Sequence, residues 1–210
     1  MAHGRYTLYG FKFTGSCAIE AALAEARVAH DFIAVNTKAG ETRADAFTKI
    51  NPRQQVPVLQ LPDGTIITEG PAILAHIADA HPAVKLSPPP GTSQRATHDR
   101  WLAFFHANLY EGELRQLFPE RYVDDPACAP SAKRAADQYV ERHFLIFESE
   151  LKNTPYVFGA DLTILDIYVW MLAQWMPQDW LAAHCPRTFR LSEAVAKRPL
   201  IAPIHAHHFG

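Results

Sequence analysis

The sequence predicts an α/β domain over residues 1–82, followed by an all-α domain over residues 94–210. Three observations lead to this fold class. In the first part of the chain, the hydrophobic pattern changes repeatedly between the period of a strand and that of a helix. Strand signals then stop at the proline-rich stretch HPAVKLSPPPGTS, within which residues 83–93 are interpreted as an interdomain linker. Beyond the linker, apolar residues recur at helical spacing.

The first domain is expected to open with a strand, a helix and a second strand. RYTLY (5–9) is short and rich in strand-forming residues, and HDFIAVN (30–36) has the same character. Between them, residues 16–28 place isoleucine, alanine and leucine at helical spacing. The chain therefore begins in the order β-α-β.

Two further strands and a helix complete this domain. VPVLQL (56–61) and TIIT (65–68) flank PDG (62–64), a turn sequence whose glycine accommodates a positive φ. These two runs are therefore predicted to pair as an antiparallel hairpin. A helix is expected to follow from Pro71, with its apolar residues on one face.

The second domain is expected to be helical over residues 94–152 and 163–181. TILD (163–166) has the Thr-x-x-Asp form of a capping box, which predicts a helix that begins just before IYVWMLAQW. Because that helix is apolar on most sides, we expect it at the centre of the second core.

Composition excludes several classes of function. The chain has 20 Lys and Arg against 22 Asp and Glu, and no basic stripe, so nucleic acid is not an expected partner. No apolar run approaches about 18 residues, and the N-terminus lacks the pattern of a signal peptide, so we expect a cytoplasmic protein with no membrane partner.

The cysteine and histidine patterns do not predict a metal site. Cys17, Cys128 and Cys185 are odd in number and form no CxxC pair, which argues against a disulfide framework or a zinc site. Three histidines gather in the tail HAHHFG (205–210) without accompanying carboxylates or cysteines, so this tail is interpreted as a solvated terminus.

Pro57 interrupts a stretch that otherwise has the character of a buried strand. A β-α-β unit joined to a β-β-α unit, with proline at the start of the third strand, is the arrangement of the thioredoxin fold, in which that proline follows a cis peptide bond. Such a bond turns the N–H and C=O of the preceding Val56 outward, where they can pair with an extended ligand. By itself, however, Val-Pro is more simply an edge-strand proline without a ligand.

The surrounding sequence adds a family resemblance. NPRQQVPVLQLPDGTIITEGPAILAHIAD (51–79) resembles the glutathione-site segment of the glutathione transferase superfamily, in which NPxGQVPxL is followed by a hairpin and by TES or TEG at the start of a helix. TILDIYVWMLAQW (163–175) and RPLI (198–201) resemble later motifs of the same superfamily, so the likeness covers nearly the whole chain. Within the superfamily, the sequence most resembles the bacterial, beta-like members. The resemblance implies a thioredoxin-like domain, a helical domain, glutathione as co-substrate, a homodimer and a role in detoxification.

The resemblance also implies residues for each part of glutathione, an extended tripeptide with one ammonium and two carboxylates. Glu69 is expected to accept the γ-glutamyl ammonium, and the N–H of Gly70, at a helix N-terminus, to hold the γ-glutamyl carboxylate. Gln55, Val56 and Pro57 are expected to line the ligand, with Val56 contributing its backbone groups.

The remaining carboxylate needs a basic partner. Arg53 and Arg43 are the candidates for the glycyl carboxylate, and the alternative for both is solvated surface charge. Gln54 departs from the family pattern, which commonly has glycine there, so we expect altered geometry in this loop.

Transferase chemistry depends on holding the glutathione thiol as thiolate, which a hydroxyl donor and a helix N-terminus both favour. LYGFKFTGSCAIE (8–20) resembles the bacterial pattern LYG-x-x-x-SGNC, in which the serine is the donor, and Thr14 stands at that serine. Ser16 is the second candidate, or else a helix cap. Cys17 is a candidate for redox chemistry if the helix N-terminus lowers its pKa, or else an inert core residue.

The electrophile is expected between the domains. RWLAFFHANLYEGELRQLF (100–118) resembles a beta-class helix that carries a histidine near the site, and Tyr110 occupies that position, where it can donate to a leaving group or carbonyl. His106, one turn earlier on much the same face, is a weaker candidate. For both residues the alternative is a core residue with a polar tip, and for His106 that alternative is the simpler one.

The sequence thus predicts a glutathione transferase acting on a small hydrophobic electrophile. Two alternatives stay open. The first is a glutathione-dependent disulfide or peroxide reductase that uses Cys17. The second is a non-catalytic binding module that keeps the fold while Thr14 and Gln54 mark a decayed site.

Overall fold

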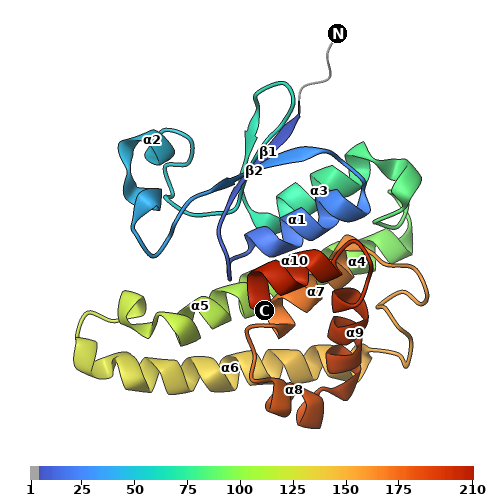
Figure 1. Cartoon of the computed structure of the whole chain (residues 1–210). Coiled ribbons are helices and arrows are strands. Elements are labelled where there is room, and N and C mark those ends of the chain that lie inside the picture. Colours follow the sequence, from blue (N-terminus) through green and yellow to red (C-terminus); the bar gives the residue numbers. More distant parts are fainter. Residues whose placement is uncertain (1–4) are drawn as a thin grey trace.

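The computed structural model describes residues 5–210 and consists of a mixed four-stranded sheet with helices, followed by a helical domain (Figure 1). The strands are β1 (Tyr6–Gly10), β2 (His30–Ala34), β3 (Val58–Gln60) and β4 (Ile66–Ile67), in the spatial order β2-β1-β3-β4. β1 pairs parallel with β2, whereas β3 pairs antiparallel with β1 and β4. This is the thioredoxin-like arrangement that the sequence predicted.

The two faces of the sheet bury different apolar sets. Helices α1 (Ser16–Glu25) and α3 (Gly70–Ala80) pack side by side between the sheet and the helical domain (Figure 1). The short helix α2 (Asp45–Thr48), preceded by the 3₁₀ turn η1 (Glu41–Arg43), lies on the other side and contributes to a smaller cluster. The alternating burial along β1 follows from the period of two in a strand.

The predicted elements of this domain are present, with shorter bounds. The first helix ends at Glu25 rather than at residue 28, and Arg27 has a left-handed φ of 56° that stops it. The helix expected from Pro71 begins at Gly70, which leaves the proline in its first turn, where a missing N–H costs nothing. The 3₁₀ turn η2 (Pro82–Val84) follows, and the boundaries at residues 82 and 94 stay a prediction.

The second domain is built from helices in the order predicted, with an interruption. Its first long segment is α4 (Ser93–Phe104), the π-helical turn η3 (Phe105–Tyr110) and α5 (Glu111–Leu117). The 3₁₀ turns η4 (Pro119–Tyr122) and η5 (Pro126–Cys128) then break the helical run expected over 94–152. The remaining helices are α6 (Ala129–Glu150), α7 (Ile164–Ala173), α8 (Gln178–His184), α9 (Pro186–Ala196) and α10 (Ala202–Phe209).

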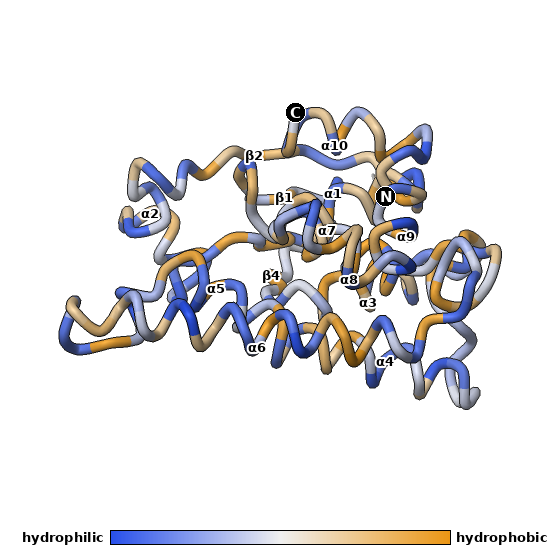
Figure 2. The backbone as a smooth tube through the Cα atoms, turned by 90° about the horizontal axis from the view of Figure 1, so that it is seen from below, coloured by the Kyte–Doolittle hydropathy of each residue, from blue (hydrophilic) through white to orange (hydrophobic). Residues whose placement is uncertain are grey.

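Helix α7 is the centre of the second core, as predicted, because every one of its residues is buried. Its capping box is confirmed: the N–H and hydroxyl of Thr163 both donate to Asp166 Oδ2, each at 2.7 Å. By contrast, α6 alternates between hydrophilic and hydrophobic along its length, as a helix on the surface does (Figure 2).

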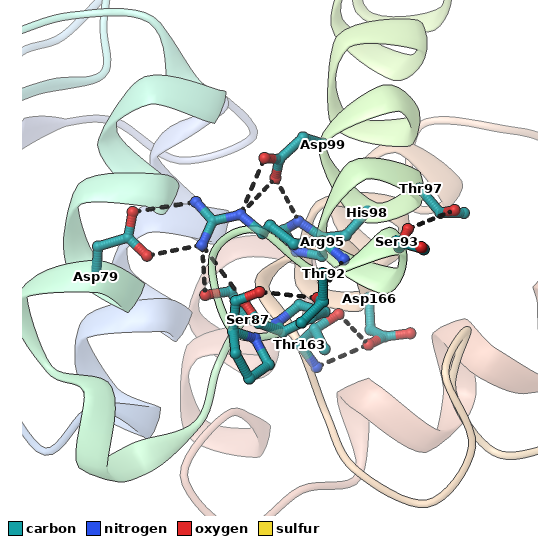
Figure 3. Close-up of polar contacts among 12 residues, drawn as sticks. Asp79, Ser87, Thr92, Ser93, Arg95, Thr97, His98, Asp99, Thr163 and Asp166 are labelled. Atoms are coloured by element: carbon teal, nitrogen blue, oxygen red, sulfur yellow. Dashed lines mark hydrogen bonds and ion pairs between the residues drawn. The ribbon is translucent and has the colours of Figure 1, made fainter.

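Arg95 ties the linker to both domains. Its guanidinium donates to Asp79 of α3 at 2.9 and 3.0 Å and to Asp99 of α4 at 2.9 Å (Figure 3). It also donates to the Ser87 hydroxyl at 3.3 Å. The proline-rich segment is therefore fixed to the helices on either side of it.

The tail is not a solvated terminus, so that expectation is wrong. Helix α10 lies beside α1 (Figure 1), and the buried His208 has its Nε2 2.9 Å from Glu20 Oε2. His207 is exposed, and within residues 5–210 no group of three or more His, Cys, Asp or Glu side chains is arranged to hold a metal ion. No helix of this described range is long and apolar enough to cross a membrane.

Candidate functional site

A pocket lies where the two domains meet, and both contribute to its walls. The first domain supplies the residue before α1, the loop before β3, and the end of the hairpin together with the start of α3; the second supplies residues of η3, α5 and α7. The lining residues are Gly15, Asn51, Arg53, Gln55, Val56, Pro57, Thr68, Glu69, Gly70, His106, Tyr110, Glu111 and Tyr168.

One wall is a strand edge. The Val56–Pro57 peptide bond is cis, and within residues 5–210 neither the N–H nor the C=O of Val56 has a hydrogen-bonding partner. Asn51 holds the loop in place, since its side chain donates to the Gln55 carbonyl at 2.8 Å and accepts from the Arg53 N–H at 3.0 Å. The pocket is therefore bordered by a backbone edge that an extended peptide can join.

Gln54 has a φ of 56°, in the left-handed region that favours glycine. The loop thus keeps a glycine-type backbone with a side chain attached, and the Gln54 amide donates to the Thr48 hydroxyl at 3.1 Å. The loop therefore accommodates Gln54 without a change of backbone geometry. Its backbone has the conformation that favours glycine, and its side chain points to α2, where it has a partner.

Glu69 stands at the start of α3 with its carboxylate at the pocket. Its φ of 67° with ψ of 110° is a costly conformation for a residue other than glycine, and such conformations gather at ligand sites. The carboxylate forms an ion pair with Arg53, and its Oε2 lies 3.4 Å from His106 Nε2. The acidic group of the first domain therefore meets a basic group of the second.

Gly70 begins α3, where the first N–H groups of a helix have no partner within the helix. A Cβ atom on Gly70 would lie 3.5 Å from Cε2 and 3.9 Å from the hydroxyl oxygen of Tyr168. The Tyr168 side chain therefore lies directly against the end of this helix.

Two tyrosines and a histidine form the wall from the helical domain. His106 Nδ1 lies 3.0 Å from the Tyr168 hydroxyl, and the rings of Tyr110 and Tyr168 are nearly parallel with centroids 6.5 Å apart. Burial raises the pKa of both phenols, so both remain hydroxyls at neutral pH. The preference for a core role for His106 is wrong, because His106 borders the pocket.

The hydroxyls expected at the thiol lie beside the pocket rather than in its lining. The Thr14 hydroxyl donates to the Phe11 carbonyl at 2.8 Å and shares a 2.7 Å hydrogen bond with Ser16 Oγ. Ser16 accepts from the Phe11 N–H at 3.2 Å and does not cap α1, whose N-cap is Gly15. Of this loop, Gly15 alone is among the lining residues.

Cys17 is fully buried, and burial raises the pKa of its thiol far above the usual range. The expectation that the helix N-terminus lowers this pKa is wrong, because desolvation outweighs the backbone N–H groups at the start of α1, which act to lower it. A buried thiol with a raised pKa is a poor nucleophile, so this environment argues against a redox role.

The two arginines proposed for the glycyl carboxylate differ in their position relative to the pocket. Arg53 borders the pocket, whereas Arg43 is exposed at the end of η1 and is not among the lining residues. For Arg43, the role at the glycyl carboxylate stays a prediction, with solvated surface charge as its alternative.

Sequence reasoning missed several lining residues: Gly15, Asn51, Thr68, Glu111 and Tyr168. Asn51 opened the segment that carried the resemblance, and its side-chain amide is a sequence signal for a loop-holding role. Tyr168 stands among apolar residues of its helix, and its one sequence signal is that a buried tyrosine needs a partner for its hydroxyl.

Glu113 is a buried carboxyl close to this wall. It is fully buried, and neither carboxylate oxygen has a hydrogen-bonding partner in the described part of the chain. Burial raises its pKa well above the usual range, and a charge on Glu113 would raise the pKa values of Tyr110 and Tyr168. A carboxyl that favours its neutral form therefore lies close to the two tyrosines of the site.

Comparison with known proteins gives consistent matches. The family model described as glutathione S-transferase, N-terminal domain, matches residues 4–79, and that described as glutathione S-transferase, C-terminal domain, matches residues 116–204. The chain is 30% identical to an uncharacterized GST-like protein YncG of Escherichia coli K12, over 94% of this chain and 95% of the relative.

Two further matches carry a described activity or ligand. Glutathione S-transferase GstA of Escherichia coli O157:H7 is 28% identical over 77% of this chain and 78% of its own. A solved structure of a sphingomonad glutathione S-transferase complexed with glutathione has a TM-score of 0.82 at 26% identity, and covers 96% of this chain and 98% of that one.

Proposed function

The chain belongs to the glutathione S-transferase superfamily, and from that premise we propose that it is a glutathione-dependent transferase, which presents the glutathione thiolate to a small hydrophobic electrophile. The observation that carries the proposal is the set of groups that line one pocket: a carboxylate, a helix N-terminus and an unpaired strand edge. An extended tripeptide with one ammonium and two carboxylates needs this set of partners.

Each part of glutathione has a partner in the proposal. Glu69 binds the γ-glutamyl ammonium, and the Gly70 N–H binds the neighbouring carboxylate. The backbone groups of Val56 pair with the cysteinyl residue, and Arg53 turns to the glycyl carboxylate. The sphingomonad structure complexed with glutathione supports this choice of ligand.

The thiol then lies near Gly15. Thr14 is the proposed thiolate donor: its O–H turns from the Phe11 carbonyl to the thiolate, and hydrogen bonds to an anion are stronger than those to a neutral carbonyl. Tyr110 approaches the same place, since its hydroxyl oxygen would lie 3.3 Å from a Cβ on Gly15. The thiolate attacks the electrophilic carbon to form a C–S bond, and Tyr110 donates to the leaving group or carbonyl.

The proposal also includes a homodimer, a cytoplasmic location and a role in detoxification. It further includes the division of the chain into domains at residues 1–82 and 94–210. The reductase alternative is not favoured by the buried Cys17. The non-catalytic alternative predicts glutathione binding without turnover.

A conjugation assay with an aryl halide tests the proposed function. We expect glutathione-dependent product, a loss of about a hundredfold in kcat/KM in Thr14→Ala, and retention of most activity in Thr14→Ser. Thr97→Ala, an exposed threonine in α4, is the matched control. Product formation that is unchanged in Thr14→Ala would refute the donor role, and absence of product in a protein that binds glutathione would favour the non-catalytic alternative.

A further inference from the structure

A chain of polar contacts crosses from one domain to the other at the end of the pocket. Glu69 Oε2 lies 3.4 Å from His106 Nε2, and His106 Nδ1 lies 3.0 Å from the Tyr168 hydroxyl. These residues come from the start of α3, from η3 and from α7, and all three border the pocket. A π-helical turn such as η3 places side chains off the regular helical register and recurs at functional sites.

His106 Nδ1 and the Tyr168 hydroxyl share a hydrogen bond in which either group can be the donor. A phenolic hydroxyl has one hydrogen to donate and an oxygen that can accept. Tyr168 can therefore accept from His106 and still donate its own hydrogen to a ligand in the pocket. The contact with His106 fixes the place of the Tyr168 oxygen.

The position of Tyr168 identifies the part of the ligand it would meet. Its ring edge lies against Gly70, at the start of α3, where backbone N–H groups without a partner in the helix can bind an anion. A carboxylate bound there can accept the hydrogen of the Tyr168 hydroxyl, while the Tyr168 oxygen keeps its hydrogen bond with His106 Nδ1 as the acceptor.

We propose that Tyr168 is a ligand-binding residue, which donates its hydroxyl hydrogen to the α-carboxylate of the γ-glutamyl group beside Gly70. His106 is the positioning residue, which holds Tyr168 and Glu69 in place for the two charges of that group. This inference rests on the proposed function. It makes recognition of the amino-acid end of glutathione a joint task of the two domains.

The consequence is selectivity for a ligand that carries both charges on the same carbon. Glu69 alone would accept any ammonium, and the N-terminus of α3 any anion. With Tyr168 in place, a peptide without the α-carboxylate leaves a buried hydroxyl and the helix end without their ligand partner. Such a peptide should bind less tightly than glutathione.

Calorimetric titration with two ligands tests the inference. The first ligand is glutathione, and the second is its analogue in which hydrogen replaces the γ-glutamyl α-carboxylate. In Tyr168→Phe, the Kd for glutathione should rise about tenfold, whereas the Kd for the analogue should equal that of the wild type. Tyr122→Phe, at an exposed tyrosine of η4, should change neither value.

Three outcomes overturn the inference: an unchanged Kd for glutathione in Tyr168→Phe, an equal rise for both ligands, and a wild type that binds neither ligand. The third outcome also refutes the proposed function, whereas the first two leave it intact. Thermal unfolding of each variant shows whether a loss of binding reflects a loss of fold.

Two rescue variants separate contact from general structure. Gly70→Ser in the Tyr168→Phe background should recover part of the affinity, because a Cβ there meets Tyr168 at an ordinary contact distance and carries a new hydroxyl.

His106→Ala should weaken glutathione binding, and His106→Asn, whose amide can replace Nδ1, should weaken it less. In the Tyr168→Phe background, His106→Ala should raise the Kd for glutathione by a smaller factor than it does in the wild type. If the two effects on the binding free energy are fully additive, His106 does not act through Tyr168.

Discussion

Arg53 and Glu69 form an ion pair across the pocket, although the two side chains are proposed to hold opposite ends of the same ligand. The pair is 54% and 39% exposed, so it is worth at most about 1 kcal/mol. Glutathione offers each residue a new partner of opposite charge, which makes exchange of this pair for two ligand contacts favourable.

The exchange predicts unequal effects of neutralising the two residues. Arg53→Gln loses a contact to the glycyl carboxylate but frees Glu69, so the Kd for glutathione should change by less than about fivefold. Glu69→Gln likewise frees Arg53, but it loses both the ammonium contact and the charged contact with His106, so it should raise the Kd by at least about tenfold. Calorimetry on both variants measures this difference. A larger effect of Arg53→Gln would show that the ion pair is needed to shape the pocket.

Cys17 should be dispensable for activity. Because its thiol is buried with a raised pKa, Cys17→Ala should leave conjugation of an aryl halide unchanged and cost about 1 kcal/mol of stability through lost packing. The same variant should be compared with wild type for reduction of a glutathione mixed disulfide. Loss of that reduction in a folded Cys17→Ala protein would revive the reductase alternative.

Glu113 should make the protein less stable as pH rises. Its pKa is raised in the folded state, so the folded protein holds the proton more tightly than the unfolded chain does. The free energy of unfolding should therefore fall from the ordinary carboxyl range upward, with a slope of about 1.4 kcal/mol per pH unit until the folded pKa is passed.

Urea unfolding at several pH values measures this effect. Glu113→Gln removes the titration, so its stability relative to wild type should improve with rising pH, whereas Glu120→Gln at an exposed glutamate should track the wild type. A constant difference between Glu113→Gln and wild type across the range would mean that Glu113 is ionised or paired in the folded protein.

Arg198 should be important for the packing of the two domains. It donates to both carboxylate oxygens of Glu25 at 2.8 Å and to the Tyr156 hydroxyl at 3.1 Å, and Glu25 is 7% exposed. Arg198→Leu leaves a buried carboxylate without its partner and should cost about 3 kcal/mol.

Chemical unfolding tests this interdomain pair through a double-mutant cycle. Arg198→Leu combined with Glu25→Leu should recover part of the loss, because the unpaired charge is then gone. Arg142→Leu, on an exposed position of α6, is the matched control. If the double variant is as unstable as the sum of the single ones, the two side chains do not act as a pair.

The parts of the fold that local sequence dictates were predictable. The turn before β4 needs a glycine with positive φ, and Gly64 has a φ of 90°. The capping box at Thr163 uses two residues three positions apart, so its signal is complete within one turn. In the site, Glu69 and Gly70 were predictable for the same reason, since they share one short segment with the strand edge.

The rest depends on contacts that the sequence does not display. Tyr168 borders the pocket only because α7 packs against the start of α3, more than ninety positions away in the chain. The burial of Cys17 and the pairing of His208 with Glu20 likewise come from packing between the domains. The π-helical turn that carries His106 has no sequence signal as simple as a cap or a glycine turn.

Calorimetric titration of reduced glutathione into the wild type and into Glu69→Ala shows whether this pocket binds glutathione through Glu69. Glu120→Ala is the control for loss of one carboxylate at an exposed position. We expect saturable binding to wild type and to Glu120→Ala, and at least about tenfold weaker binding to Glu69→Ala. A folded wild type that does not bind glutathione would show that the pocket is not a glutathione site, and a Glu69→Ala variant that binds it equally well would show that Glu69 does not hold the ligand.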